Sequence, residues 1–228
     1  MINNMYRILF LLCFPMLFHS QETNWGIGII NFPETEQAVS IYNAPQGNEI
    51  GFLELSNYGS DSNPVALNWR NQEGISLRIP SSALMEIGYE EQGLVVLENK
   101  DGFIRVFDDN GQQSQWLSLE KLRENGFEYL PWIRFMVTSD RSFLPMFYGM
   151  NVRNASTAAA SLLVLAKGEQ FEITPTGKVN GLWAEVIVQE FDSVYCEMPH
   201  NLLNTYTGWI KILDDAGYPN IWFYARGC

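Results

Sequence analysis

Short apolar runs separated by turn-forming residues dominate the chain, and they predict β-strands rather than long helices. Phe171 and Ile173 alternate with polar residues before a Pro-Thr-Gly turn, and residues 182–188 alternate in the same way. Alternation with a period of two is typical of strands that bury one face, and several such runs favour a small barrel or sandwich. Only residues 118–125 and 157–165 suit a short helix.

An internal repeat is the strongest pattern. Residues 102–122 and 208–228 align without gaps, with Gly, Ile, Asp, Asp, Gly and Trp recurring in place, and residues 41–45 weakly resemble residues 152–156. Two copies of one unit explain both similarities. We therefore expect the repeated segments to form equivalent strands of two domains, with Ile104 and Ile210 facing the same way.

The second copy carries motifs in a recognisable order. The segment Met-Asn-Val-Arg-Asn-Ala-Ser-Thr at residues 150–157 precedes runs that begin at Val164, Asn180 and Thr207. Over about 80 residues this order resembles the bacterial SH3-like (SH3b) domain family. The first copy resembles the family more loosely, through residues that begin at Val39 and Gly102.

The resemblance and the repeat together imply an all-β fold of two tandem SH3-like small β-barrels with long loop insertions. The insertions fall at residues 56–82 and 189–207. A polar stretch at residues 138–142 places the domain boundary, which gives a divergent SH3-like domain at 21–138 and an SH3-like domain at 139–228.

The first twenty residues predict export. Arg7 precedes an apolar run from Ile8 to Phe18, and this order is typical of a secretory signal peptide at residues 1–20. The run is about half the length that spans a bilayer and Pro15 interrupts it, which favours a cleaved signal over the alternative of a retained membrane anchor. Leu12 occupies the position where a lipoprotein signal has a small residue before its cysteine. We expect a periplasmic or extracellular protein without a membrane anchor.

Charge and cysteine content narrow the partners and the redox state. The chain has 26 acidic and 14 basic residues, a net charge of -12, which argues against nucleic acid as a partner. After removal of the signal, Cys196 and Cys228 remain. In an exported chain an even pair favours one disulfide, with two free thiols as the alternative.

The residues available for catalysis or metal binding are few. His200 is the only histidine after residue 20, and it lies in a loop near Cys196, which favours an exposed loop residue over a nucleophile–base pair. One histidine and two distant cysteines do not suit zinc. The acidic pairs at 108–109 and 214–215 lack the spacing of a calcium loop and favour turns. We expect no catalytic residue, no metal and no cofactor.

Aromatic side chains are the remaining candidates for binding. Trp183 and Trp209 lie on predicted strands, where we expect both to be buried. Consecutive aromatic residues at 222–224 cannot all face inward, because side chains alternate along a strand. A predicted ligand groove lies between the loop 189–207 and the strand from Trp222, and its expected contacts are Tyr195, Tyr206, Tyr224 and Trp222.

The family resemblance also implies a function. SH3-like domains of exported bacterial proteins attach to cell-wall peptides or glycans, or to protein partners. The expected function is therefore a secreted, non-catalytic binding module for a cell-wall peptide or glycan or for an envelope protein. The alternative is a structural or interaction subunit of an envelope complex with no small ligand.

Overall fold

The structure is a computed structural model, and it describes most of the chain after the predicted signal. The described residues are 25–33, 37–57, 65–77, 79–88, 91–109, 113–139, 141–146, 149–194, 201–215, 217 and 219–223. The signal segment 1–20, Cys196, Cys228 and His200 lie outside them, so the export signal and the disulfide stay predictions.

The chain is mostly β-structure, as the sequence predicts, and its described strands pair antiparallel throughout. A seven-stranded sheet has the order β5-β4-β3-β2-β10-β9-β8. Its strands are β2 (Gln37–Tyr42), β3 (Glu49–Asn57), β4 (Val65–Asn71), β5 (Ser76–Leu77), β8 (Glu98–Lys100), β9 (Phe103–Asp109) and β10 (Gln113–Ser118).

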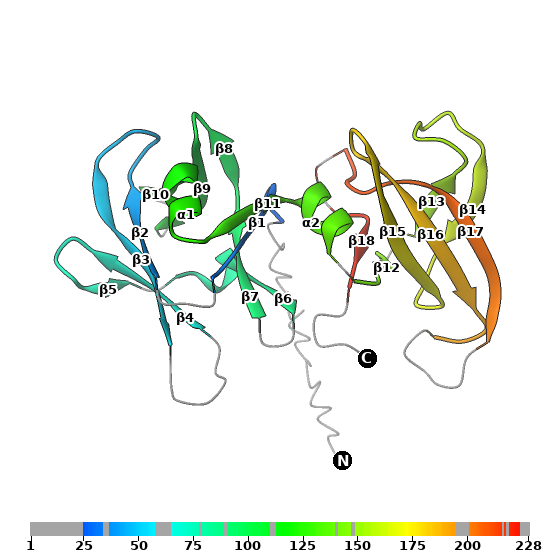
Figure 1. Ribbon diagram of the computed structural model, residues 1–228, viewed down its shortest axis with the longest axis horizontal. Coiled ribbons are helices and arrows are strands. Elements are labelled where there is room, and N and C mark those ends of the chain that lie inside the picture. The colour runs from blue at the N-terminus through cyan, green and yellow to red at the C-terminus, as the bar shows by residue number, and fades with distance from the viewer. Residues whose placement is uncertain are drawn as a thin grey trace, which may run out of the picture.

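A five-stranded sheet with the order β14-β13-β17-β16-β15 lies at the other end of the molecule (Figure 1). Its strands are β13 (Met150–Arg153), β14 (Leu162–Ala166), β15 (Phe171–Asn180), β16 (Trp183–Phe191) and β17 (Leu202–Lys211). Between the two ends lie α2 (Trp132–Thr138) and the short strands β12 (Leu144–Pro145) and β18 (Ile221–Trp222), which pair with each other.

A central four-stranded sheet, β11-β1-β7-β6, is buried on both faces. It consists of β1 (Gly28–Asn31), β6 (Leu84–Gly88), β7 (Glu91–Val96) and β11 (Glu128–Pro131). Ile29 of β1 and Val95 of β7 pack into one core. Their neighbours Ile30 and Leu94 pack into the other. All four side chains are at most 1% exposed. This sheet is therefore a wall shared by two hydrophobic cores.

The two cores differ in how they relate to the predicted domain boundary. One core lies within the first half, between the seven-stranded and central sheets. The other combines Ile29, Val95 and the α2 residues Trp132, Phe135 and Met136 with the buried face of the five-stranded sheet. The boundary at 138–142 coincides with the end of α2 and stays a prediction, but buried contacts pass across it.

The predicted helices have opposite outcomes. Residues 118–125 do form a helix, α1 (Leu119–Glu124), and the Ser118 hydroxyl caps it by accepting a hydrogen bond from the Lys121 amide at 3.4 Å. The helix predicted at 157–165 is wrong, because Leu162–Ala166 is strand β14. Pairing with β13 there prevails over the weak helical composition.

Parts of the two insertions predicted as irregular loops form strands among the described residues. Residues 56–82 contain the end of β3, all of β4 and β5, and the start of a 3-10 helix at Ser81–Ala83. Residues 189–207 extend the β16–β17 hairpin, in which Gln189 pairs with Thr205. The backbone amide and side-chain amide of Asn201 both donate to the Asp192 carboxylate, at 2.8 and 2.7 Å. In these described parts, strand pairing therefore replaces the predicted irregular structure.

The repeated segments are equivalent only in part. Ile104 and Ile210 both face a core and are fully buried, as predicted, each in a different core. The neighbours of the repeated strands differ, so the prediction of equivalent strands is wrong there. The second repeated strand, β10, pairs with β9 and separates it from β2. In the later copy β13 takes the corresponding place beside β17, so β18 pairs with β12 instead.

The five-stranded sheet does not close among the described residues. Only residues 167–170 separate its two edge strands, β14 and β15. At the β15 edge, the backbone of Phe143 exchanges two hydrogen bonds of 2.8 Å with Ile173. No closed barrel is found in the described sheets, and the SH3-like assignment stays a prediction. None of the described helices is long and apolar enough to cross a bilayer.

Candidate functional site

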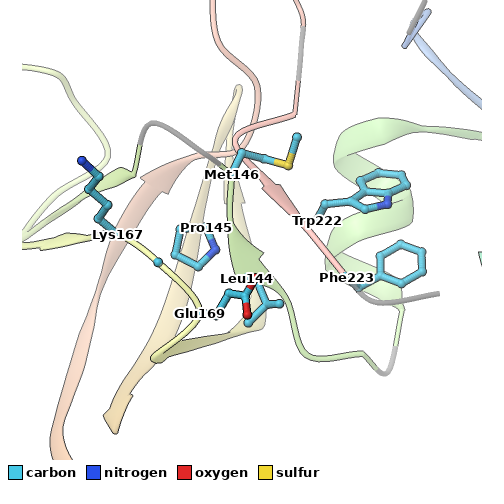
Figure 2. Close-up of a pocket in the computed structure, with 8 residues that line it drawn as sticks. Leu144, Pro145, Met146, Lys167, Glu169, Trp222 and Phe223 are labelled. Carbon is cyan, nitrogen blue, oxygen red and sulfur yellow. The ribbon is translucent and has the colours of Figure 1, made fainter. Parts of the chain in front are cut away.

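An open pocket lies where β12, β18 and the turn after β14 meet (Figure 2). Its volume is about 420 Å³, within the range of roughly 300–1,000 Å³ that is typical of ligand sites. The lining residues are Leu144, Pro145, Met146, Lys167, Gly168, Glu169, Trp222 and Phe223. Most of them are apolar, and the two ionisable residues have opposite charge.

Backbone pairing between distant segments builds this pocket. Leu144 of β12 pairs with Trp222 of β18, and the Met146 amide donates to the Asn220 carbonyl at 3.0 Å. Gly168 supplies the turn on the opposite side with a φ of +94°, a conformation that favours glycine. The pocket therefore depends on a pairing between residues about eighty positions apart in the chain.

Trp222 is held in place by other aromatic rings. Its ring stacks on Phe223 with centroids 4.8 Å apart, and it meets Trp25 edge-on at 4.8 Å and Trp132 at 5.5 Å. Trp132 is fully buried and its indole N–H donates to the Trp25 carbonyl at 2.7 Å. This aromatic wall is preorganised, which reduces the entropy that a ligand would lose on binding.

Arg141 contacts both the aromatic wall and the central sheet. Its guanidinium lies 4.7 Å from the Phe223 ring centroid and 5.6 Å from that of Phe135. The same guanidinium donates to the Ile87 carbonyl and lies 3.7 Å from the Glu91 carboxylate. A cation over aromatic faces and beside a carboxylate stabilises this contact between β6–β7 and the pocket wall.

The charged residues of the pocket lie at its rim. Lys167 and Glu169 are both exposed, and Figure 2 shows Lys167 on the opposite side of the pocket from Trp222. The Met146 side chain extends toward Trp222 in the same view. The apolar group of a ligand could contact Trp222 and Met146 here, while its ionised end could pair with Lys167 or Glu169.

Of the predicted binding residues that the structure describes, Trp222 lines this pocket and Tyr206 does not. Tyr195 and Tyr224 lie outside the described residues. Tyr206 lies on β17, where its hydroxyl donates to the Glu190 carboxylate at 3.1 Å. Burial raises the pKa of this tyrosine, and the hydrogen bond and charge of Glu190 raise it further. The role of Tyr206 as a ligand contact stays a prediction, but it does not belong to this pocket.

The prediction that Trp183 and Trp209 are buried is wrong. Their neighbours Ala184 and Ile210 are fully buried, whereas both tryptophans are half-buried. Because side chains alternate along β16 and β17, the tryptophans lie on the outer face of the sheet. The sequence correctly predicted that the two tryptophans lie on strands. It did not show which face of the sheet they occupy, because that depends on which of the alternating residues are buried.

The described residues contain no cluster of three or more His, Cys, Asp or Glu side chains placed to bind a metal ion. The predicted turn at 214–215 is confirmed, since the Gly217 amide donates to the Asp214 carbonyl at 3.2 Å. Lys211 donates to the Asp215 carboxylate, and this lowers the pKa of that carboxyl. The acidic pair Asp108 and Asp109 does not itself form the predicted turn, because its backbone belongs to strand β9.

Comparisons with known proteins identify no relative. No protein-family model, curated protein or solved structure matches the chain. The pocket is thus interpreted from its own residues.

The sequence interpretation overlooked most of the pocket. Residues 144–146 follow the polar stretch of the predicted boundary, and residues 167–169 form a turn between two strands. Residues 144–146 have no motif, and residues 167–169 belong to the run from Val164, which supported the family resemblance but not a binding site. The available signal was the apolar run around Pro145, which is too rich in large side chains for an ordinary linker.

Proposed function

We propose that this protein is a secreted, non-catalytic binding module that recognises the peptide part of the cell wall through the pocket beside Trp222. The observation that supports the proposal is the combination of a preorganised apolar wall with one cation and one anion at the rim. Wall peptides combine small apolar side chains with carboxylate and ammonium groups, so both parts of such a ligand find a counterpart.

The proposal includes the SH3-like assignment of residues 139–228. The motifs of this half support it, together with an antiparallel sheet whose edge strands are joined by only four residues. Export follows from the signal architecture of residues 1–20. The first half supports the pocket from behind, because Trp25 and Trp132 contact Trp222.

A pair of pocket variants tests the proposal. Met146→Asp introduces a charge beside the apolar wall, and Lys167→Glu reverses the charge at the rim. We expect Met146→Asp to weaken binding of purified soluble wall peptide about tenfold or more, and Lys167→Glu to weaken it about threefold. Isothermal titration calorimetry measures both affinities, and wild-type retention on purified peptidoglycan gives a second readout.

The matched control is Lys100→Glu, the same charge change at an exposed residue of β8 outside the pocket lining. It should bind as the wild type does, and all variants should keep the wild-type melting temperature within a few degrees. If the wild-type chain binds the glycan strand but not the wall peptide, the glycan and not the peptide is the ligand. A chain that binds neither would contradict the proposal and favour the interaction subunit of an envelope complex.

A further inference from the structure

The two edges of the five-stranded sheet are protected to different degrees. Strand β15 contains Pro175 and Lys178, and Phe143 pairs with its edge at Ile173. Proline, lysine and edge coverage are the devices by which proteins prevent unwanted strand addition. Strand β14 has none of them, since Leu162–Ala166 contains no proline and no ionisable residue.

The other edge strands in the described sheets are also protected. Strands β5, β12 and β18 are only two residues long. Strands β6, β8 and β11 carry acidic residues, namely Glu86, Glu98 and Glu128. Among the described edges, β14 is therefore the one that combines a length of five residues with a wholly neutral, apolar sequence.

Exposed leucines accompany this open edge. Leu162, Leu163 and Leu165 are 52%, 43% and 52% exposed, and no described strand pairs with the β14 side that faces away from β13. Unpaired backbone groups flanked by exposed apolar side chains form a template for another strand. Such an edge is expected to be covered in the working protein.

The charge distribution favours a second copy of this chain as the partner. The chain has a net charge of -12, so most surfaces of two copies repel each other. Residues 154–166 form a neutral stretch flanked by Arg153 and Lys167. Two copies of β14 can approach there without opposing carboxylates, and leucine meets leucine when the strands run antiparallel.

We propose that β14 pairs with β14 of a second copy, antiparallel and centred on Val164, to form a symmetric dimer with a continuous ten-stranded sheet. This register places Leu163 of one copy opposite Leu165 of the other. A two-fold contact of this kind uses the same patch on both copies and closes without further growth. The interface is small, which predicts a weak, concentration-dependent dimer. The proposal is independent of the pocket and of wall binding.

Sedimentation equilibrium of the mature chain tests the dimer, from about 5 µM to about 1 mM, with reductant present to exclude intermolecular disulfides. Leu163→Lys and Leu165→Lys each add a charge to the edge of both copies, and each should weaken dimerisation about tenfold or more. The matched control is Ile187→Lys, at an isoleucine that is 38% exposed on β16, where strands pair on both sides, and it should dimerise as the wild type does. Circular dichroism confirms that each variant is folded.

A wild-type chain that stays monomeric at about 1 mM overturns the proposal and leaves the edge to a strand of another protein. A dimer that survives both substitutions on β14, or that Ile187→Lys disrupts equally, also overturns it. Faster amide hydrogen exchange in β14 on dilution, with β15 unchanged, would support the assigned strand. Equal exchange of β14 at all concentrations would place the dimer contact elsewhere.

Discussion

Replacing Trp132 with alanine is expected to lower the free energy of unfolding by about 3–5 kcal/mol. The side chain is fully buried, and its rings contact Trp25, Phe135 and Trp222. Alanine leaves a cavity in the core that both halves of the chain share, and it removes the indole donor from the Trp25 carbonyl. Urea denaturation followed by far-ultraviolet circular dichroism measures the loss.

The control for this substitution is Trp183→Ala, which removes a tryptophan of the same size from the outer face of β16. Because Trp183 is only half-buried, its loss should cost clearly less than that of Trp132. Trp132→Phe should recover part of the lost stability by refilling the cavity. If the two alanine variants lose equal free energy of unfolding, the ring contacts of Trp132 contribute little to the core that both halves share.

The substitutions Ile104→Ala and Ile210→Ala should each cost about 2–5 kcal/mol, because both side chains are fully buried. They occupy corresponding positions of the sequence repeat but belong to different cores. Their effects should therefore add to within about 0.5 kcal/mol in the double variant. Equilibrium denaturation of the two single variants and the double variant measures this coupling.

Ile187→Ala provides the comparison, since this isoleucine is 38% exposed on the outer face of β16 and should cost about 1 kcal/mol or less. A coupling well above 0.5 kcal/mol between the two buried positions would mean that the central sheet transmits strain between the cores. A small loss at either buried position would contradict its place in the core.

The parts of the fold that the sequence predicted are those with a local signal. Strands β15 and β16 alternate because only one face of each is buried, and α1 begins at a capping serine. Strands β1 and β7 went unrecognised because both of their faces are apolar, which removes the alternation. Helix α2 was missed because its seven residues are mostly aromatic or β-branched, and it is stabilised by burial at Trp132, Phe135 and Met136.

The candidate site was less predictable than the fold. Trp222 stood out because three consecutive aromatic residues cannot all face inward on one strand. Its partner Leu144 carries no comparable signal, because the pairing of β12 with β18 arises from the tertiary arrangement. The repeat was also misleading, since local similarity at residues 102–122 and 208–228 does not determine which strand becomes the neighbour.

The doubly buried central sheet has a consequence for strand alignment. In a sheet with one solvent-exposed face, shifting a strand by one residue would expose its apolar side chains to water. The free-energy cost of that exposure fixes the strand register. Between two apolar cores that penalty largely disappears. Close contacts at glycine take its place: a side chain at Gly93 would come within 2.4 Å of the Ile29 side chain, and one at Gly28 within 2.4 Å of the Leu130 carbonyl oxygen. Shape rather than polarity thus keeps β7, β1 and β11 aligned.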